Sequence, residues 1–239
     1  MPTQKLPPHI SKKFDNELEE IRSQVMAMGG LVEQQLTLAL KALVEGDAQL
    51  AESVINNERQ VNTYEVSIDE ECTRILARRQ PAAGDLRLVM AVGKTITDLE
   101  RIGDEAEKIA KKAIDLSTRP SMQSYHIGIN AMGNLVSSMV HQSLDGFARM
   151  DSHAALVTAE MEPESDDQYA ALIRQLITYM MEDPRNITSA LDAVWVARAM
   201  ERIGDHARNI CENIIYFVEG KDVRHISLEQ MEKEVNAPR

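Results

Sequence analysis

A five-residue motif, Glu-Arg-Ile-Gly-Asp, occurs twice in this chain, at residues 100–104 and again at residues 201–205. Around each copy, apolar residues recur every three or four positions, which is the spacing of residues on one face of an α-helix. The two copies begin 101 residues apart (201 − 100 = 101), a little under half of the 239 residues. The chain is therefore predicted to fold as two similar helical halves.

Each copy carries two features that weaken a helix. Its Glu and Asp lie four residues apart, where like charges repel by about 0.2–0.5 kcal/mol, and its Gly costs roughly 1 kcal/mol relative to Ala. Both carboxylates directly follow apolar residues of the stripe, so they border the buried face, where a cation could be held between helices. The simpler alternative is that Arg101 and Arg202 neutralise the acids while the Gly permits close packing. Because both penalties are repeated, we favour a metal site, and its predicted ligands are Glu100, Asp104, Glu201 and Asp205.

The composition favours helices throughout. Aromatic residues make up only 4% of the chain, and no segment alternates like the strands of a hairpin. The predicted fold is all-α, with two tandem, sequence-related three-helix bundles over residues 11–118 and 121–220, followed by a polar tail over 221–239. The periodic segments predict six long helices, at residues 11–45, 48–79, 85–117, 124–150, 152–182 and 186–219.

Several helix ends follow from single residues. Asp47 and Asp151 occupy equivalent positions (151 − 47 = 104) and are expected N-caps, and Asp85 is the expected N-cap of the third helix. Gly220 is expected to end the sixth helix. The first ten residues are predicted to be a loose tail, and residues 119–121 to interrupt the helical pattern between the halves. The C-terminal tail is expected to hold one short amphipathic turn.

The formal net charge of −12 argues against nucleic acid as a partner and against direct adsorption to an anionic membrane. No segment resembles a signal peptide or reaches the ~18 consecutive apolar residues of a membrane span. Cys72 and Cys211 each lie within a helical pattern and are predicted to be separate buried thiols in a reducing cytoplasm. A basic cluster, Lys108, Lys111 and Lys112, is interpreted as structural, because cations are favoured near a helix C-terminus.

A second set of polar pairs follows the repeat. An offset of 104 residues relates Glu58 and Asn62 to Glu162 and Asp166. Adjacent antiparallel helices could bring each of these pairs beside one Glu-Arg-Ile-Gly-Asp motif, giving four oxygen-bearing side chains in each bundle. Such oxygen ligands suit iron, manganese, magnesium or calcium better than a metal that prefers thiolates. The alternative is that these side chains lie on an ordinary solvated helix face.

No catalytic constellation is found. Di-iron carboxylate enzymes use a Glu-x-x-His pattern on two helices, and none of the six histidines has a Glu three residues before it. His206 follows Asp205, but Glu105 occupies the equivalent position of the first half. Phosphate-binding loops of the Gly-xxxx-Gly-Lys type and Gly-x-Ser-x-Gly elbows are also absent from the sequence. These observations favour a protein that binds rather than catalyses.

The chain resembles the PhoU family of phosphate-uptake regulators over roughly residues 10–225. The resemblance depends on five stretches: MAMGGLVEQQL (26–36), IDEECTRILARRQP (68–81), DLRLVMAVGKTITDLERIGD (85–104), IRQLITYMMED (173–183) and ERIGDHARNICE (201–212). It implies a cytoplasmic, all-helical homodimer. Since no catalytic residues are found, the expected activity is binding and not catalysis, and since the surface is acidic, any association with the inner membrane is expected to run through protein partners. The partners implied are the ATPase subunit of a phosphate ABC importer and a sensor histidine kinase that controls the phosphate-starvation response, on which the family acts as a negative regulator.

The resemblance also implies metal clusters, because some family members carry iron or zinc on repeated Glu/Asp-xxx-Asp motifs. The matching positions here are Glu100 and Asp104, Glu201 and Asp205, Glu162 and Asp166, and Glu58 with Asn62. Asn62 departs from the family pattern, since a neutral amide is a weaker ligand than a carboxylate. Iron, zinc, manganese and magnesium all remain open as the bound metal. Two other functions also remain open: a metal-binding helical scaffold or chaperone without a signalling role, and a carboxylate-metal enzyme.

Overall fold

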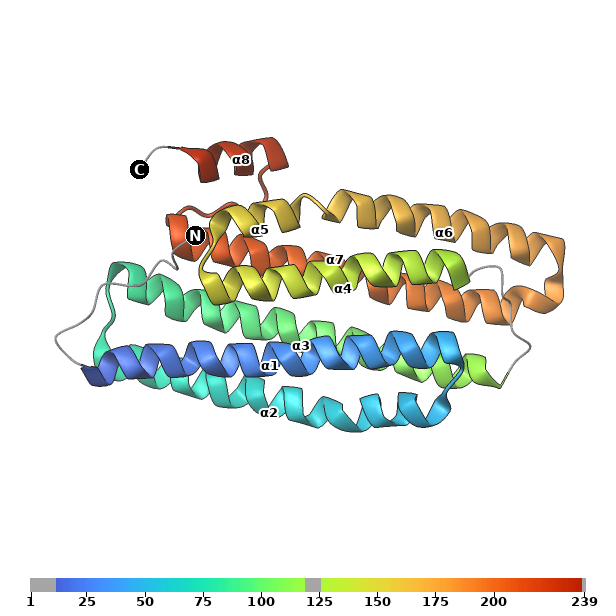
Figure 1. The fold of residues 1–239 in the computed structure, drawn as a ribbon, viewed down its shortest axis with the longest axis horizontal. Helices are drawn as coiled ribbons and strands as arrows, with labels where there is room; N and C mark the ends of the chain where they lie inside the picture. The colour runs from blue at the N-terminus through green and yellow to red at the C-terminus, as the bar shows by residue number, and fades with distance from the viewer. Residues whose placement is uncertain (1–11, 119–125, 238–239) are drawn as a thin grey trace.

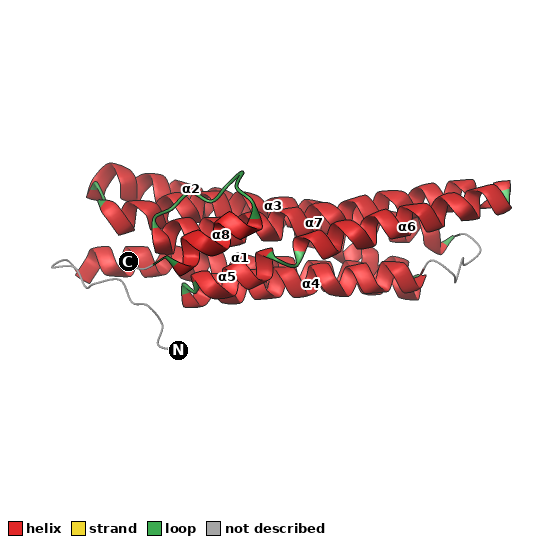
Figure 2. Ribbon diagram, turned by 90° about the horizontal axis from the view of Figure 1, so that it is seen from above, coloured by secondary structure: helices red, strands yellow, loops and turns green. Residues whose placement is uncertain are grey.

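The computed structural model describes residues 12–118 and 126–237, and every secondary-structure element in these ranges is helical, as predicted. The long helices lie side by side along the length of the molecule (Figure 1), and the described loops, such as those between α1 and α2 and between α2 and α3, are short (Figure 2). In chain order the elements are α1 (Lys12–Glu45), α2 (Ala48–Arg79), α3 (Ala83–Ser117), α4 (His126–Arg149), α5 (Ser152–Ala159), α6 (Glu162–Glu182), the 3-10 turn η1 (Pro184–Asn186), α7 (Ile187–Glu219) and α8 (Leu228–Asn236).

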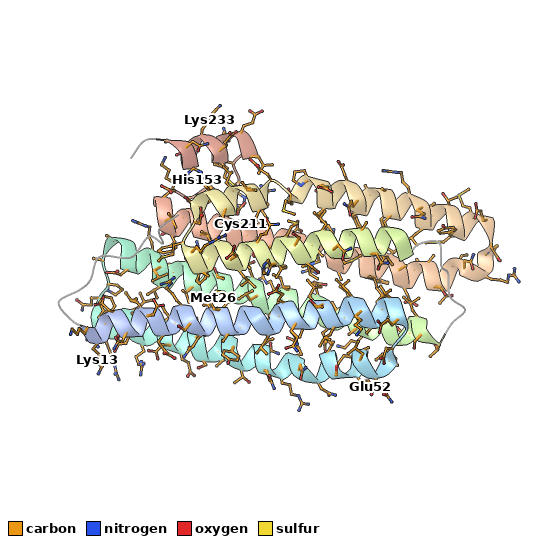
Figure 3. The ribbon with its side chains drawn as sticks, in the orientation of Figure 1. Lys13, Met26, Glu52, His153, Cys211 and Lys233 are labelled. Carbon is orange, nitrogen blue, oxygen red and sulfur yellow. The ribbon has the colours of Figure 1, made fainter. Side chains whose placement is uncertain are left out.

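The helices form two bundles that meet along α3 and α7. Helices α1, α2 and α3 contact one another, and α7 contacts α4, α5 and α6 in the second bundle. Lys13, near the start of α1, and Glu52, near the start of α2, lie at opposite ends of the first bundle, so α1 spans its length (Figure 3). Figure 1 shows α3 and α7 running in opposite directions, so the C-terminal end of α3 lies beside the N-terminal end of α7. The interior is filled by Ile, Leu, Val, Met and Ala side chains.

A second contact, between α1 and α4, shows that the halves are related by an approximate two-fold axis. Gly29 of α1 faces Leu144 of α4, and the leucine methyl leaves no room for a Cβ atom. Gly133 of α4 faces Leu40 of α1 in the same way, with 3.1 Å between an added Cβ and Leu40 Cδ2. The glycines and the leucines are both related by the offset of the repeat (133 − 29 = 104; 144 − 40 = 104). Each half therefore inserts its leucine into the groove that the other half's glycine creates.

The structure corrects two of the predicted elements. The helix expected over residues 152–182 is interrupted between α5 and α6, because Pro163 at the start of α6 cannot donate an N–H to residue 159 and its ring would clash with that carbonyl. The third helix begins at Ala83, with Ala82 as its N-cap, so the prediction of Asp85 as the cap was wrong. Asp85 lies instead in the first turn, where a carboxylate is still favoured by the helix dipole.

Other helix ends agree with the sequence. Asp47 accepts a hydrogen bond from the Leu50 N–H, and Asp151 accepts one from the Ala154 N–H, each at 3.0 Å. Gly220 ends α7 in the left-handed conformation (φ 74°), which glycine adopts without strain. The predicted loose N-terminal tail and the interruption at 119–121 lie outside the described residues.

The expected amphipathic turn of the C-terminal tail is the helix α8, which contacts α5 and buries Met231 and Val235.

Both cysteines are buried and free, as predicted; Figure 3 shows Cys211 in the interior of the second half. Burial raises the pKa of the Cys72 thiol to about 12, so this thiol remains protonated. Among the described helices, none combines the length and apolar character needed to cross a lipid bilayer.

Candidate metal centres

The C-terminal acidic centre consists of Glu162 and Asp166 on α6 and Glu201 and Asp205 on α7. One carboxylate oxygen each from Glu162, Asp166 and Asp205 lies within 4.8 Å of the other two, a spacing that allows all three to coordinate one ion. The break at Pro163 contributes to this arrangement, because it places Glu162 in the first turn of α6, where the helix dipole favours a carboxylate.

Two arginines accompany this centre. Arg208 donates to Glu162 (2.8 Å, Nη1 to Oε2), and Arg198 donates to Glu201 (2.6 Å, Nη1 to Oε1). The second oxygen of Glu201, Oε2, is buried, and no residue that the structure describes forms a hydrogen bond with it. A buried carboxylate oxygen without a donor is costly, so this atom is well suited to coordinate a cation.

Three acids of the C-terminal acidic centre, Glu162, Glu201 and Asp205, have raised pKa values. Burial raises the pKa of Asp205, and the nearby charge of Asp166 raises it further. Burial also raises the pKa of Glu162, although Arg208 opposes the shift, and burial together with Asp205 raises the pKa of Glu201. A divalent cation would remove this penalty, because its charge favours the ionised form of every acid around it.

The N-terminal acidic centre consists of Glu58 and Glu65 on α2 and Glu100 and Asp104 on α3. Glu58 is only 7% exposed, and its Oε2 accepts a hydrogen bond from Gln35 Nε2 of α1 (3.2 Å). Its Oε1 is buried and, within residues 12–118 and 126–237, has no hydrogen-bond partner, like Oε2 of Glu201 in the other half. Both centres therefore hold an unsatisfied carboxylate oxygen between helices.

Burial raises the pKa of Glu58 to about 7, against the pull of Gln35, and the charges of Asp104, Glu107 and Glu100 add to the shift. Burial also raises the pKa of Glu100, and the negative charges of Asp104 and Glu65 raise it further. Glu58 therefore exchanges its proton near neutral pH, and a metal would have to displace that proton.

Glu65 is a candidate site residue that the sequence analysis did not identify. Burial raises its pKa, and the charges of Asp69 and Asp104 raise it further, so it shares the electrostatic environment of the motif acids. The signal that could have found it is its spacing, because Glu65 follows Glu58 by seven residues, or two helical turns, and so lies on the same face of α2. The predicted ligand Asn62 is exposed.

The glycine of each motif faces a polar side chain of the neighbouring helix. A Cβ atom added at Gly103 would lie 3.2 Å from Glu58 Oε2 and 3.3 Å from Gln35 Oε1. At Gly204 it would lie 3.1 Å from Ser165 Oγ, a buried hydroxyl without a hydrogen-bond partner. Glycine costs roughly 1 kcal/mol in a helix, and its lack of a side chain leaves room for oxygen-bearing groups to approach the motif closely in both halves.

The motif arginines do not neutralise their neighbours in the simple way that the alternative interpretation requires. Arg202 pairs with Glu105 of α3 (3.1 Å) rather than with an acid of its own motif. Arg101 is exposed and attracts Glu100 only as a nearby charge. His206 lies 3.0 Å from Asp98 across the bundle interface and not in the adjacent acidic centre. Three carboxylates converge in the C-terminal acidic centre, which is the donor set of a hard divalent cation, whereas the acids of the N-terminal acidic centre are linked only by their electrostatic influence on one another.

Comparison with known proteins identifies the fold and the family. A family model described as "PhoU domain" matches residues 25–113 and again residues 129–214. The chain belongs to the PhoU family. The two matched segments contain one copy of the Glu-Arg-Ile-Gly-Asp motif each, so the internal repeat is a repeat of the PhoU domain.

Curated PhoU relatives match nearly the whole chain. A Pseudomonas putida protein named "Phosphate-specific transport system accessory protein PhoU homolog" is 51% identical over 95% of this chain and 89% of its own length. The Escherichia coli K12 protein named "Phosphate-specific transport system accessory protein PhoU" is 48% identical over 94% of this chain and 93% of its own.

Solved PhoU structures have the same arrangement of helices. The crystal structure of PhoU from Pseudomonas aeruginosa has a TM-score of 0.85 at 49% identity and covers 87% of this chain and 100% of its own. That of "the phosphate transport system regulatory protein PhoU from Streptococcus pneumoniae" has a TM-score of 0.81 at 31% identity, covering 88% and 99%. The predicted all-α fold of two related three-helix bundles is therefore confirmed.

Proposed function

We propose that this protein is a non-enzymatic regulator of phosphate uptake that also holds the phosphate-starvation response off when phosphate is plentiful. The observation that carries the proposal is the match of both PhoU domains, with curated relatives named as accessory proteins of phosphate-specific transport systems. The similar Streptococcus pneumoniae protein, which is described as a phosphate transport system regulatory protein, supports the same role.

The regulation acts by protein contact. One partner is the ATPase subunit of a phosphate ABC importer, and the other is a sensor histidine kinase, which the protein keeps in its phosphatase-favouring state. A location at the cytoplasmic face of the inner membrane follows from these partners. The net charge of −12 supports attachment through proteins rather than through anionic lipid headgroups, which repel it. The active species is a homodimer.

The two acidic centres bind divalent or trivalent metal ions, with iron, zinc, manganese and magnesium as the candidates. Support comes from the convergence of three carboxylates in the C-terminal acidic centre and from the unsatisfied buried oxygens of Glu58 and Glu201. Residues that would hold the metal are Glu162, Asp166, Glu201 and Asp205 in one half, and Glu58, Glu65, Glu100 and Asp104 in the other. In each centre the ion neutralises acids on two helices at once. It therefore links α6 to α7 in the C-terminal acidic centre and α2 to α3 in the N-terminal acidic centre.

A deletion strain and a membrane pull-down test this proposal together. Deleting the gene should derepress phosphate-starvation genes in phosphate-rich medium, and the purified protein should retain the importer ATPase and the kinase from solubilised membranes. Variants with neutral residues at both motif acid pairs (Glu100→Gln with Asp104→Asn, and Glu201→Gln with Asp205→Asn) should lose stoichiometric metal. The exposed change Asp167→Asn, which leaves the centres intact, is the matched control.

The outcomes separate the alternatives. Normal repression in the deletion strain, with metal still bound, would favour a metal-binding scaffold without a signalling role. Turnover that depends on Glu201 and Asp205 would favour a carboxylate-metal enzyme. Unchanged metal content in the motif variants would place the ligands elsewhere, and the regulatory proposal would then stand without the metal.

A further inference from the structure

A pocket of about 370 Å³ lies between the C-terminal half of α3 and the N-terminal half of α7, and no step of the proposed function uses it. Five of its eight lining residues are cations, although the chain as a whole carries a charge of −12. They are Lys108, Lys111 and Lys112 from α3, and Arg198 and Arg202 from α7. A local excess of positive side chains in an acidic protein calls for an explanation beyond helix stability.

The repeat relates this pocket to a filled position at the other end of the α3–α7 contact. There, the Asp98 carboxylate of α3 is surrounded by three α7 side chains: His206 Nδ1 lies 3.0 Å from it, and Asn209 and Asn213 donate to it at 3.2 and 3.3 Å. An approximate two-fold axis exchanges α3 with α7 through the offset of 101. It maps Asp98 to Ala199, and the three surrounding residues to Glu105, Lys108 and Lys112. All four of these counterparts line the pocket.

The comparison shows what the pocket lacks. At one end of the interface, the protein's own carboxylate fills the space between the helices. At the other end, Ala199 provides no acidic group, and two lysines stand where the asparagines stand. Within the lining, Glu105 is the single acid, and it is shared by Lys108 (3.0 Å) and Arg202 (3.1 Å). An anion from outside the chain would occupy the place that Asp98 occupies in the other copy.

The cations retain donors for such an anion. Lys111 pairs with Glu107, Arg198 with Glu201, and Lys112 with both Asp115 and Asp192, so the surroundings of the pocket are close to neutral. A lysine ammonium has three N–H donors and an arginine guanidinium has five, and these pairs use only part of them. Selection therefore depends on directed hydrogen bonds inside the pocket and not on a large positive potential.

Trp195 supplies an apolar surface at the same place. It lines the pocket and is 64% exposed, although tryptophan is usually well covered in a folded protein. Arg198 and Ala199 follow it by three and four residues, on the same face of α7. A planar ring stacked on an indole beside cationic side chains gains both dispersion and electrostatic energy. The volume lies at the lower end of the range for small-molecule sites.

We propose that this pocket binds a small organic anion that carries a planar aromatic ring, as a nucleoside monophosphate does. The phosphate or carboxylate takes the position equivalent to the Asp98 carboxylate and accepts from Lys108, Lys112 and Arg202. The ring lies against Trp195. The pocket contains none of the acids assigned to the metal centres, and it adjoins the C-terminal acidic centre through the pair of Arg198 with Glu201.

The indole is itself a probe, because Trp195 is the one tryptophan in the sequence. Titrating the full-length protein with AMP should change the tryptophan fluorescence, with a matching heat signal in calorimetry. Adenosine and inorganic phosphate, titrated separately, should each bind at least about tenfold more weakly, because each lacks one of the two recognised parts. No binding of AMP, or equal binding of AMP and inorganic phosphate, would overturn the proposal.

Two variants test the location. Ala199→Asp builds the counterpart of Asp98 and should abolish AMP binding, whereas Ala131→Asp adds the same charge at an exposed site on α4 and should leave it unchanged. Trp195→Ala removes an exposed side chain, so the fold is preserved, and calorimetry should report affinity weakened by about 5- to 100-fold. Binding that persists in both Ala199→Asp and Trp195→Ala would place AMP elsewhere and refute the assignment.

Discussion

The two acidic centres share a motif but differ in the helix that faces it. In the C-terminal acidic centre, α6 supplies Glu162 and Asp166, and their oxygens come within 4.8 Å of Asp205. In the N-terminal acidic centre the equivalent of Asp166 is Asn62, which is exposed, and Glu65 joins one turn later along α2. The motif therefore fixes only half of each site, and the facing helix determines whether the acids converge.

The two acidic centres also differ in the charge of a neighbouring residue. Arg208 pairs with Glu162 in the second half, but its equivalent in the first half is Glu107 (208 − 101 = 107), which raises the pKa of Glu58. One centre thus has a built-in cation, and the other an additional acid. We expect the C-terminal acidic centre to bind metal over a wider pH range, because protons compete most strongly at Glu58.

The largest expected effect is the loss of metal from the three converging acids of the C-terminal acidic centre, Glu162, Asp166 and Asp205, which we call the acid triad. Replacing Glu162 with Gln and Asp205 with Asn removes two of three converging ligands, and should weaken manganese binding at that centre more than about 100-fold. Calorimetry should then report only the sites of the N-terminal acidic centre. Asp167→Asn is the control, since Asp167 is exposed beside the triad. If both halves lost metal together, the centres would not be independent.

The next effect tests the N-terminal acidic centre without metal. Glu58→Gln should stabilise the metal-free protein at about pH 8 by up to about 3 kcal/mol. The pKa of Glu58 is raised from 4.5 in the unfolded chain to about 7 in the folded protein. Between these pH values the carboxyl group ionises in the unfolded state but remains protonated in the folded state, which favours unfolding. Wild-type stability therefore falls as pH rises through this window, and the glutamine variant should not show this fall.

Urea unfolding in a chelating buffer at about pH 5 and about pH 8 measures this difference. The gap between the variant and the wild type should be small at the lower pH and largest at the higher one. Glu52→Gln, an exposed change on the same helix, should have no effect at either pH. A constant gap across the range would show that ionisation of Glu58 is not its cause.

The sequence was sufficient for the fold because helical periodicity is local information. The spacing of the apolar stripe, the stop at Gly220 and the caps at Asp47 and Asp151 each depend on residues within a few positions of where they act. The break before α6 was missed because Pro163 lies among residues that otherwise continue the pattern. Its effect depends on a backbone clash with residue 159 and not on hydrophobicity.

The candidate sites were less accessible, because they depend on which helices face each other. The acids of the motif were found by repetition, but Glu65 has no counterpart at the offset of 104, where Tyr169 stands. The basic cluster at Lys108, Lys111 and Lys112 was interpreted as structural, since its place opposite Trp195 and Ala199 appears only when α3 and α7 are packed together.

A smaller effect should follow from removing the cation of the second half. Arg208→Gln loses the bond to Glu162 and the ion pair with Glu212 (3.3 Å), and should destabilise the metal-free protein by about 1–2 kcal/mol, because two largely covered carboxylates lose their cation. Metal should then compensate, so the rise in melting temperature on adding manganese should be larger than in the wild type. Glu107→Gln, the matched change in the first half, should reduce that rise.

The smallest effects compare the two caps, which are equivalent in sequence and identical in geometry at 3.0 Å. Asp47 is exposed and begins the uninterrupted α2, so Asp47→Ala should cost about 0.5 kcal/mol. Asp151 is partly buried and begins the short α5, which cannot spread the loss over a long helix, so Asp151→Ala should cost about 1 kcal/mol. Denaturant unfolding distinguishes these values, and Asn at either position should restore most of the loss because it also caps. If the two costs were equal, the break at Pro163 would not affect how the second half is stabilised. The asymmetry between the halves would then be confined to the charges around the metal centres.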